Sequence, residues 1–426
     1  MMQKNIAVIG AGYVGLVSGA CFAKLGNNVI CVDVDESKVE SINKSKAPIY
    51  ELDLDDILSS NKERIHATTD YKSAIKKGNT TFVCVGTPSL SDGGIDLSYV
   101  KQVVKEIGIT LKEINNWHNV VIKSTVLPGT TQNILLPILE KSSAKKAGKD
   151  FGLSMNPEFL REGTAVYDFL NPDRIVIGSF DNRSKEDLRE LYSDFDCPII
   201  ETSLSAAEMI KYASNCFLGT KISFINEIGN FCKGIGVDTY EVAEGIGLDK
   251  RIGRSFLNSG IGWGGSCFPK DINALIFWAK KNGYSSKILN NVVKVNDIQP
   301  LKLVELLKKH ITNLKGKTIG ILGLAFKPNT DDIRESRAIP IILKLIEEGA
   351  QIKVFDPKAM DNFKQQFPNI KIHYCSSSDE VLDSDAVLIT TIWDEFKNLD
   401  YNNKLVIDGR RLKEAESARI YEGVCW

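Results

Sequence analysis

Length, composition and charge limit what this chain of 426 residues can be. A chain of this length exceeds one ordinary hydrophobic core, so two or three packed units are expected. Hydrophobic residues make up 43% and charged residues 25%, as in globular proteins, and a formal net charge of -1 gives no general attraction to nucleic acid or an anionic membrane.

Targeting and metal-binding signals are absent from the sequence. No apolar run approaches the ~18 residues of a membrane span, and a strand is expected too soon after Met1 for a signal peptide. The nine cysteines are scattered, without a C-x-x-C pair or a histidine at zinc-ligand spacing. Such usage is typical of a reducing compartment. We therefore expect a cytoplasmic protein with no metal, nucleic-acid partner or membrane anchor.

The first predicted element is a buried strand, residues 5–9, which leads into a glycine-rich loop and an apolar helix ending near Gly26. The loop has the spacing G-x-G-x-x-G over Gly10, Ala11, Gly12, Tyr13, Val14 and Gly15. The first glycine permits the tight turn, the second lets the backbone approach a pyrophosphate, and the third lets the helix pack on the strand. The helix N-terminus then offers N–H groups to phosphate.

An acidic residue follows at the distance that a dinucleotide site requires. The second strand, residues 29–32, ends at Asp33, 18 residues after Gly15. A carboxylate there accepts hydrogen bonds from an adenosine ribose and repels a 2′-phosphate, so NAD is favoured over NADP. Lys38 lies close enough to weaken that preference. Strand, loop, helix, strand and acid in register are far more specific than the glycine spacing alone.

Two further strands, residues 81–85 and 120–122, end beside polar residues. Gly86 and Thr87 follow the first strand, and Lys123, Ser124 and Thr125 follow the second. Because ligands of an open parallel sheet lie at the carboxyl ends of its strands, both threonines are predicted to point toward the cofactor. Threonine also commonly caps a following helix, and the two roles are compatible.

Residues 205–233 contain neither proline nor a loop signal and are predicted to form one helix, about 40 Å long at 1.5 Å per residue. A helix of this length suits a connector between domains or the core of a dimer. Glu208, Lys211 and Asn215 recur at i, i+3 and i+7 and share one face. Within the helix alone, a solvated polar face is favoured over a functional one as the explanation of this pattern.

The second half of the chain repeats the βα pattern. Strands are predicted at residues 317–322, 351–355, 385–390 and 404–407, and the first two lead to Gly323 and Asp356. That interval spans 33 positions, against 23 from Gly10 to Asp33, and its loop lacks the G-x-G-x-x-G spacing. A related α/β unit is expected, without a second dinucleotide. Two cations near the loop, Lys327 and Arg334, suit a different phosphate ligand.

One cysteine stands apart from the other eight. Cys267 lies in a glycine-rich stretch that leaves its sulfur approachable, and nearby Lys270 favours the thiolate. Asp271 adds a carboxylate beside this nucleophile. In an NAD enzyme a thiolate can trap an aldehyde as a thiohemiacetal, which loses a second hydride to give a thioester that water hydrolyses. Cys267 therefore favours a four-electron oxidation of an alcohol to an acid.

Four segments resemble the UDP-glucose/GDP-mannose dehydrogenase family in order and spacing along the whole chain. They are Asn156–Gly163 (NPEFLREG), the Lys211 helix, Gly264–Asp271 (GGSCFPKD) and Ala325–Pro328 (AFKP). The resemblance implies two Rossmann-like doubly wound parallel-sheet domains joined by a long central helix. An NAD-binding domain over residues 1–200, a central helical dimerisation region over 201–300 and a C-terminal UDP-sugar-binding domain over 301–426 are then expected.

The motifs look most like the UDP-glucose branch, which implies NAD-dependent oxidation of UDP-glucose at C6 to UDP-glucuronate. UDP-N-acetylmannosamine and GDP-mannose are the alternative substrates within the family. A two-electron hydroxyacid dehydrogenase would explain the first half but leaves Cys267 and the second α/β unit without a role. The yield of NADH per substrate separates these readings.

The resemblance also implies catalytic roles. Cys267 is implied as the nucleophile, and Lys211 as the cation that stabilises alkoxide and oxyanion, with Asn215 as a second donor. Asp271 is expected to position or activate a water in the first oxidation. Glu162 is expected to act as the base in thioester hydrolysis.

The same resemblance implies the binding residues. Thr125 is expected to orient water or the nicotinamide, and Arg251 to reach across a dimer into the neighbour's site. Gly260 is expected to leave room for close approach of the substrate. The implied cofactor contacts are Gly10, Ala11, Gly12, Tyr13, Val14, Gly15, Asp33, Lys38, Val85, Gly86, Thr87, Ser124, Thr125, Glu162, Lys270 and Arg334. The implied substrate contacts are Glu158, Phe159, Leu160, Glu162, Lys211, Asn215, Arg251, Phe256, Leu257, Asn258, Ser259, Gly260, Gly264, Cys267, Phe326, Lys327 and Arg410. The implied partners are NAD, UDP-glucose and further copies of the chain in a homodimer or larger homo-oligomer.

Overall fold

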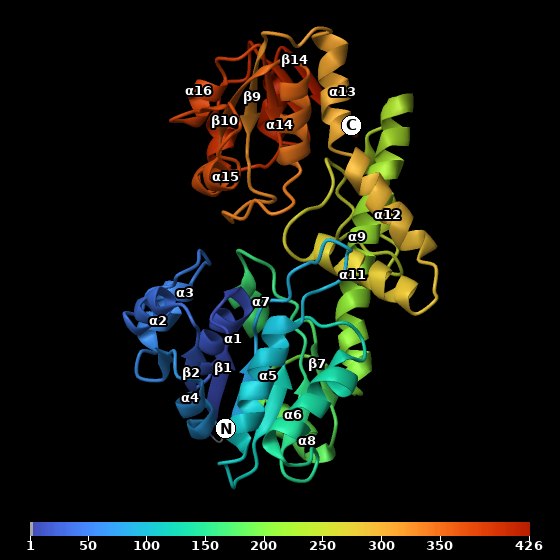
Figure 1. Ribbon diagram of the computed structural model, residues 1–426. Helices are drawn as coiled ribbons and strands as arrows, with labels where there is room; N and C mark the ends of the chain where they lie inside the picture. Colours follow the sequence, from blue (N-terminus) through green and yellow to red (C-terminus); the bar gives the residue numbers. More distant parts are fainter. Residues whose placement is uncertain (1–2) are drawn as a thin grey trace. The chain divides into compact units, whose positions relative to one another are not determined.

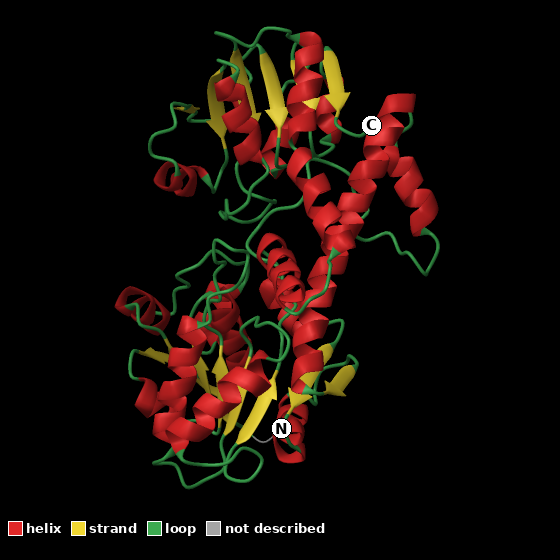
Figure 2. Cartoon of the chain, turned by 45° about the vertical axis from the view of Figure 1, so that its right-hand side comes forward, coloured by secondary structure: helices red, strands yellow, loops and turns green. Residues whose placement is uncertain are grey.

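The computed structural model describes residues 3–426, and the chain forms two compact units that divide between Ser214 and Asn215. The division falls inside the longest helix, α9 (Leu204–Ile235), which has 32 residues (Figure 1). Each unit contains one sheet with helices packed against it (Figure 2). Within the described residues, no helix is long and apolar enough to cross a membrane.

The first unit holds an eight-stranded sheet in the order β3-β2-β1-β4-β5-β6-β7-β8. All neighbouring strands run parallel except β6 and β7. The first six strands have the order of a dinucleotide-binding fold. The strands are β1 (Asn5–Ile9), β2 (Asn28–Val32), β3 (Ile65–Thr68), β4 (Thr80–Val83), β5 (Asn119–Ile122), β6 (Gly152–Met155), β7 (Ile175–Ser179) and β8 (Ile199–Thr202).

Helices cover both faces of this sheet, which explains why its central strands are apolar throughout. Ile6 and Val8 of β1 pack into one core, and the alternate residues Ala7 and Ile9 pack into another. The helices of the unit are α1 (Tyr13–Lys24), α2 (Glu36–Asn43), α3 (Leu54–Ser60), α4 (Tyr71–Lys77), α5 (Ser98–Leu111), the π-helix η1 (Thr131–Leu135), α6 (Leu136–Ser143), α7 (Ala165–Leu170), α8 (Asn182–Leu191) and the first part of α9.

The second unit holds a six-stranded sheet, all parallel, in the order β11-β10-β9-β12-β13-β14. Its strands are β9 (Thr318–Leu322), β10 (Gln351–Phe355), β11 (His373–Tyr374), β12 (Ala386–Ile389), β13 (Leu405–Asp408) and β14 (Ile420–Gly423). Its helices are the rest of α9, α10 (Thr239–Gly247), α11 (Phe268–Lys281), α12 (Lys287–Ile298), α13 (Leu301–His310), α14 (Ala338–Glu347), α15 (Met360–Gln366), α16 (Ser378–Val381), η2 (Asp394–Asn398) and η3 (Lys413–Ser417). Renumbered from β9, its strand order repeats that of the first six strands.

The predicted fold class, two Rossmann-like α/β units and a long central helix, is confirmed. The predicted helix 205–233 begins one residue earlier and ends two residues later. The predicted strand 81–85 ends at Val83, because the chain turns there toward the polar segment that follows. The sequence does not predict several strands, among them β6, whose glycine and serine weaken the local signal.

Candidate active site

The three glycines of the first loop are glycine for different reasons. Gly10 has a φ of +97°, which other residues rarely adopt, and a Cβ on Gly15 would lie 1.8 Å from the Gly10 carbonyl oxygen. A Cβ on Gly12, by contrast, would meet nothing within 4 Å. The fold itself therefore requires Gly10 and Gly15, whereas the small size of Gly12 keeps the backbone open to a ligand.

Asp33 follows β2 and is half-buried, with its carboxylate against this loop. It accepts the N–H of Ala11 at 2.8 Å and that of Asp35 at 3.1 Å. A carboxylate has about four acceptor positions, so about two remain for ribose hydroxyls. Helix α1 begins at Tyr13 without a side-chain cap, which leaves its first N–H groups for an anion. These residues fit NAD, and Lys38 lies half-buried on the next helix, α2.

Further predicted cofactor contacts lie where β4 and β5 end. The Thr87 hydroxyl donates to the carbonyl oxygen of Thr125 at 2.9 Å, and the Ser124 hydroxyl donates to that of Val85 at 2.6 Å. Gly86 is exposed beside them. The structure therefore brings these five residues together through bonds between the segments that follow two adjacent strands.

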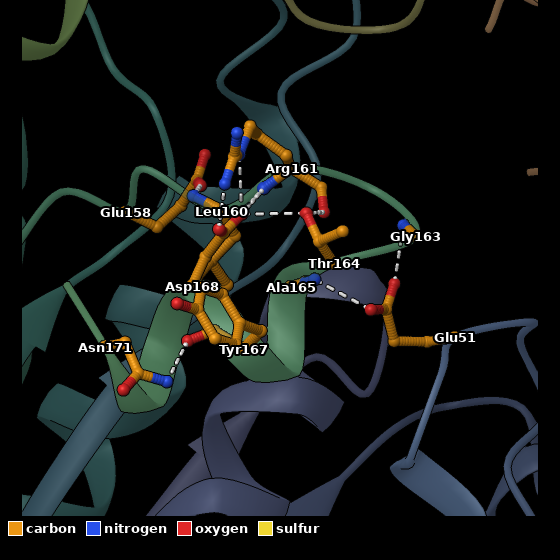
Figure 3. A network of polar contacts seen from close by, with 10 residues as sticks. All are labelled: Glu51, Glu158, Leu160, Arg161, Gly163, Thr164, Ala165, Tyr167, Asp168 and Asn171. Atoms are coloured by element: carbon orange, nitrogen blue, oxygen red, sulfur yellow. Dashed lines mark hydrogen bonds and ion pairs between the residues drawn. The ribbon is translucent and has the colours of Figure 1, made fainter. Parts of the chain in front are cut away.

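The segment 158–165 is held by side chains that the sequence analysis does not predict for this purpose (Figure 3). Buried Glu51 accepts the N–H of Gly163 and that of Ala165, each at 2.7 Å. The N–H of Gly163 also donates to the Tyr13 hydroxyl at 2.7 Å. The glycine-rich loop and this segment are thus joined, and Glu51 satisfies the N-terminal N–H of α7.

An ion pair between Arg161 and Asp168 also holds this segment (Figure 3). Arg161 donates from Nε to Asp168 Oδ2 at 3.0 Å and from Nη2 to Asp168 Oδ1 at 2.5 Å. Its backbone N–H donates to the same carboxylate at 2.9 Å. Glu162 is partly buried between this ion pair and the bonds of Gly163, so its backbone is fixed on both sides.

Glu158 and Lys211, both predicted to contact substrate, form a buried ion pair. The Lys211 Nζ lies 2.9 Å from Glu158 Oε1, and 5.4 Å from the ring centroid of Phe159. The second carboxylate oxygen of Glu158 accepts the N–H of Leu160 at 2.6 Å. Burial acts to raise the pKa of Glu158, but the Lys211 ammonium and the Leu160 N–H hold it below its ordinary value. Glu158 is therefore ionised at neutral pH.

The polar face of α9 is buried. Glu208, Lys211 and Asn215 are 0%, 3% and 6% exposed, so the solvated-face interpretation is wrong. The Glu208 carboxylate accepts the N–H of Gly129 at 2.6 Å and that of Thr131 at 2.8 Å, at the N-terminus of η1. The turns on both sides of Lys211 are thus packed, and the position of its ammonium is fixed by the helix.

Cys267 directly precedes the first residue of α11 and is partly exposed. The positive end of this helix favours a thiolate there. Lys270, expected to favour it from a loop, lies in the first turn of α11 and pairs its ammonium with the Asp271 carboxylate. Because those two charges offset each other, the helix terminus is the stronger reason for a thiolate.

Asp271 lies one helical turn after Cys267 and is 1% exposed. Its carboxylate accepts the Asn215 amide at 2.6 Å and is paired with Lys270. One amide hydrogen of Asn215 remains for another acceptor. The second unit therefore brings Asn215, Lys270 and Asp271 together beside the start of α11.

The loop 256–260 is anchored to three other segments of the second unit. Asn226 of α9 accepts the N–H of Gly260 at 2.8 Å, and Gln299 donates to the carbonyl oxygen of Gly260 at 2.8 Å. The Tyr240 hydroxyl of α10 donates to the loop backbone at 3.2 Å. Leu257 and Ser259 are buried, Phe256 is half-buried with a φ of +65°, and Asn258 is exposed.

Gly260 has a different reason for being glycine from the one expected. A Cβ there would lie 2.7 Å from the carbonyl oxygen of Gly409, so the close approach is that of the chain's own backbone. Neighbouring Arg410 donates to the carbonyl oxygens of Thr390 at 2.9 Å and Gly262 at 3.2 Å. Within the described residues Arg410 forms no ion pair, and burial lowers its pKa to about 10. Such a guanidinium suits an anionic ligand.

The segment before Cys267 packs against the loop that follows β9. A Cβ on Gly264 would lie 2.1 Å from the carbonyl oxygen of Glu335, and one on Gly265, whose φ is +84°, would lie 2.6 Å from the Phe326 ring. The N–H of Gly265 donates to the carbonyl oxygen of Arg334 at 2.9 Å. Phe326 and the Arg334 backbone therefore support the start of α11.

Three predicted cationic contacts lie toward the surface. The Arg334 guanidinium pairs with Asp332 at 2.6 Å, and the Arg251 guanidinium, 89% exposed, pairs with Asp249 at 2.6 Å. Lys327 is half-buried over the ring of the preceding residue. The reach of Arg251 into a neighbouring subunit stays a prediction.

Sequence reasoning missed several buried polar residues that support these positions. Glu51, Lys123 and Asn226 are 7%, 4% and 0% exposed. Their partners lie far away in the sequence, so no local spacing could have identified them. Buried charged residues are rare, so their burial beside a predicted site residue would have identified them. That burial becomes known only once the fold is known.

In the described part of the chain, one group of His, Cys and Glu side chains could hold a metal. The ligand atoms of His373, Cys375 and Glu380 lie within 4.8 Å of one another. The Glu380 carboxylate is already engaged by the His373 ring at 2.6 Å and by the N–H of Ser376 at 2.8 Å. The hydrogen bonds of the Glu380 carboxylate to His373 and Ser376 thus explain the cluster without a metal. The segment contains no predicted site residue.

Comparisons with known proteins agree over nearly the whole chain. Residues 4–196, 205–298 and 320–415 match the NAD binding, central and UDP binding domains of the UDP-glucose/GDP-mannose dehydrogenase family. UDP-glucose 6-dehydrogenase AglM of Haloferax volcanii is 45% identical and is aligned over 99% of this chain and 100% of its own. GDP-mannose 6-dehydrogenase of Pseudomonas aeruginosa is 37% identical, over 99% and 100%. The structure of a UDP-glucose dehydrogenase from Pyrobaculum islandicum is similar with a TM-score of 0.96 at 41% identity, over 100% and 98%.

Proposed function

Because the chain belongs to the UDP-glucose/GDP-mannose dehydrogenase family, we propose that it oxidises UDP-glucose at C6 to UDP-glucuronate, with two NAD molecules each accepting one hydride. The observation that carries the proposal is the position of Cys267. Seven of the nine cysteines are buried, and of the other two only Cys267 precedes a helix N-terminus, where a thiolate is favoured. A two-electron dehydrogenase that oxidises an alcohol only as far as the carbonyl forms no thioester and needs no such thiolate.

The first oxidation converts the C6 alcohol to an aldehyde, and the cysteine separates it from a second oxidation and a hydrolysis. The cysteine sulfur adds to the C6 aldehyde, and the carbonyl oxygen becomes the hydroxyl of a thiohemiacetal. Loss of a hydride and a proton gives a thioester, and water then breaks the C–S bond to release the carboxylate and return the thiol. Two NAD molecules, bound one after the other, would supply the hydride acceptors for the two oxidations.

The chain's own residues hold protons and charge around these steps. The Lys211 ammonium, which is paired with Glu158 at 2.9 Å, donates to the substrate oxygen as negative charge develops on it. Asp271 accepts a proton or holds a water in the first oxidation, and Asn215 orients its carboxylate. Glu162 serves as the base for thioester hydrolysis.

The binding roles follow the two α/β units. Gly12, the first turn of α1 and Asp33 hold the pyrophosphate and adenosine ribose of NAD. In the second unit, the anchored loop 256–260 and Arg410 hold the nucleotide sugar. Arg410 forms no ion pair within the described residues, and the phosphates of the ligand are its anionic partner. Residues 1–200, 201–300 and 301–426 remain our proposed division of these tasks.

The test is the ratio of NADH formed to nucleotide sugar consumed. Limiting UDP-glucose with excess NAD should give two NADH per sugar, with UDP-glucuronate as the product by mass spectrometry. UDP-N-acetylmannosamine and GDP-mannose, assayed in parallel, should react far more slowly. One NADH per sugar, or faster turnover of either alternative, would overturn the proposed substrate or the proposed four-electron chemistry.

We also propose that the chain forms a homodimer through α9. Phe217, Phe224 and Phe231 recur every seven residues, so they share one helix face, and they are 64%, 50% and 62% exposed. Three exposed aromatic side chains on one stripe favour burial against another apolar surface. A second copy is the simplest occupant, because the same stripe on each chain forms a self-complementary contact.

Light scattering tests this assembly. The wild type should have at least the mass of a dimer, and Phe224→Asp should shift it toward the monomer without unfolding either unit. A wild type that is monomeric and fully active at assay concentration would contradict the proposal. Since none of the nine cysteines forms a disulfide, we propose the reducing cytoplasm as its compartment.

A further inference from the structure

Lys123 is a buried cation to which none of the proposed roles assigns a task. It follows β5, two residues before Thr125, and is 4% exposed. Its ammonium donates to Asn156 Oδ1 at 2.9 Å and to the carbonyl oxygen of the same residue at 3.4 Å. Within residues 3–426, no carboxylate lies in ion-pair contact with it. An ammonium without its own carboxylate is costly to bury, so a purely structural role explains it poorly.

The amide that binds Lys123 does not depend on it. Asn156 Oδ1 also accepts the Tyr192 hydroxyl at 2.7 Å, and the Asn156 amide nitrogen donates to the carbonyl oxygen of Val176 at 2.9 Å. These two bonds fix the orientation of the amide. An uncharged side chain at position 123 would therefore leave Asn156 satisfied.

The titratable groups around Lys123 come from every element packed against it. They are Cys84 after β4, Glu158 after β6, Tyr192 after α8 and Lys211 of α9. Burial raises the pKa of Cys84 to about 12 and also raises the pKa of Tyr192, so both are neutral. Glu158 is ionised, as its pKa is held low. One carboxylate thus faces two ammonium groups.

We propose that Lys123 is a positioning residue that adds its charge to the buried ion pair of Glu158 and Lys211 without itself contacting the carboxylate, so that the three buried side chains carry one net positive charge. A neutral pair of Glu158 and Lys211 would have no charge to spare. With Lys123 present, an oxyanion on the substrate neutralises the group, so the excess charge stabilises that oxyanion. The inference rests on the proposed function, because the oxyanion is that of C6 oxidation.

The excess charge should depend on pH. Burial lowers the pKa of Lys123, Glu158 opposes this and Lys211 adds to it, and the resulting pKa is about 8. In the enzyme without substrate, the net positive charge is therefore present below about pH 8 and lost above it.

Profiles of kcat/KM between pH 6.5 and 10 test the role in the reaction. The wild type should decline above about pH 8. Lys123→Met should lower kcat at pH 7 by about 10-fold and remove this decline. Lys123→Arg should keep part of the activity and stay level above pH 8, because a guanidinium remains charged. Wild-type kcat and an unchanged profile in Lys123→Met would overturn the proposal, and the KM for NAD should be unaltered throughout.

Thermal unfolding tests the buried charge without any substrate. Since the folded-state pKa of Lys123 is depressed, its favourable contribution to stability is complete above the unfolded-state pKa and is lost as pH falls through about 8. Lys123→Met should therefore have a higher Tm than the wild type at pH 7, and the difference should shrink as pH rises toward 10. A lower Tm that does not vary with pH would mean that Lys123 only joins β5 to β6.

Lys4→Met is the matched control. The Lys4 side chain is 11% exposed and pairs with Asp187 at 2.8 Å and Glu190 at 3.0 Å, just before β1 and so at the amino ends of the strands. It should lower the Tm and leave the kcat/KM profile unchanged. If the wild type forms no NADH from UDP-glucose, the proposed function fails, whereas the Tm comparison at position 123 still decides whether the charge is present.

Discussion

The two α/β units share a strand order and the turn after their first strand, but they differ in whether the aspartate after the next strand is open to a ligand. Gly10 after β1 and Gly323 after β9 both have a φ of +97°, and an aspartate follows the next strand in each unit. Asp33 is half-buried and accepts two backbone N–H groups. Asp356 is 1% exposed and accepts the N–H groups of Leu324, Ala325, Lys358 and Ala359 as well as the Trp393 indole.

The helix that follows each loop differs in the same way. Helix α1 begins three residues after Gly10, whereas α14 begins fifteen residues after Gly323. The inserted residues include Phe326 and Arg334, which pack against the segment before Cys267. In the first unit, the N-terminus of α1 and Asp33 remain open to a nucleotide. In the second unit, which has the same topology, the chain itself occupies Asp356 and the space before α14, and the inserted residues support a neighbouring loop.

The largest expected effect, on the free energy of unfolding, comes from removing the Asp356 carboxylate. Asp356→Ala leaves at least four buried N–H groups without their acceptor, which should cost at least about 3 kcal/mol of unfolding free energy. For a unit of this size that lowers its Tm by about 6–12 °C. Differential scanning calorimetry and hydrogen exchange on the second unit measure this. Asp33→Ala is the matched control and should leave the Tm within a few degrees. Equal losses in both variants would contradict the comparison.

Acid should affect the two units in opposite directions. Burial lowers the pKa of His118 in the first unit to about 4, so its unfolded state binds more protons as pH falls from about 6.5 to about 4, and stability falls there by about 3 kcal/mol. In the second unit, burial raises the pKa of Asp408 from 3.8 to about 6, so its folded state binds the proton more tightly and gains stability as pH falls through that window.

Hydrogen exchange at pH 7 and pH 5 resolves this contrast between the units. Protection should decrease in the strands of the first unit and hold in those of the second. His118→Gln should reduce the acid sensitivity of the first unit, since no imidazole is left to be charged. Equal loss of protection in both units would show that these buried groups do not control the response.

A smaller effect is expected on cofactor choice. Asp33→Ala removes the acceptor for the adenosine ribose, so the KM for NAD should rise by roughly 10-fold and the preference over NADP should narrow. Steady-state kinetics with both cofactors measure the two changes. Asp356→Asn, which retains an oxygen acceptor, should leave both KM values unchanged. An Asp33→Ala enzyme with wild-type preference would place the ribose elsewhere.

Local sequence was enough for the fold and for part of the site. The glycine spacing and Asp33 identify the first βαβ unit because each residue acts on its immediate neighbours. The occupied state of Asp356 could not be predicted, since Trp393 lies 37 residues away and the loop geometry that brings Leu324 to the carboxylate has no spacing signature. The same holds for Glu51 and Lys123, whose partners Gly163, Ala165 and Asn156 lie far away along the chain.

For two of the predicted site residues, the structure shows a neighbour that the sequence does not predict. Gly260 was expected to leave room for a ligand, but the approaching group is the Gly409 backbone. Lys270 was expected to favour the thiolate, but its charge is matched by Asp271, and the terminus of α11 replaces it. Residue types alone do not say which neighbour a side chain meets first.

The central claim is that Cys267 separates two oxidations, and its direct test is the number of NADH formed per active site. A thiolate forms far more readily near pH 7 than an alkoxide, so a serine cannot take its place. With UDP-glucose and NAD in a single-turnover experiment, Cys267→Ala and Cys267→Ser should fold and bind NAD but yield at most about one NADH per site, with no thioester by intact mass spectrometry. Formation of the sugar acid by Cys267→Ala at near wild-type rate, with two NADH per sugar, would contradict the account.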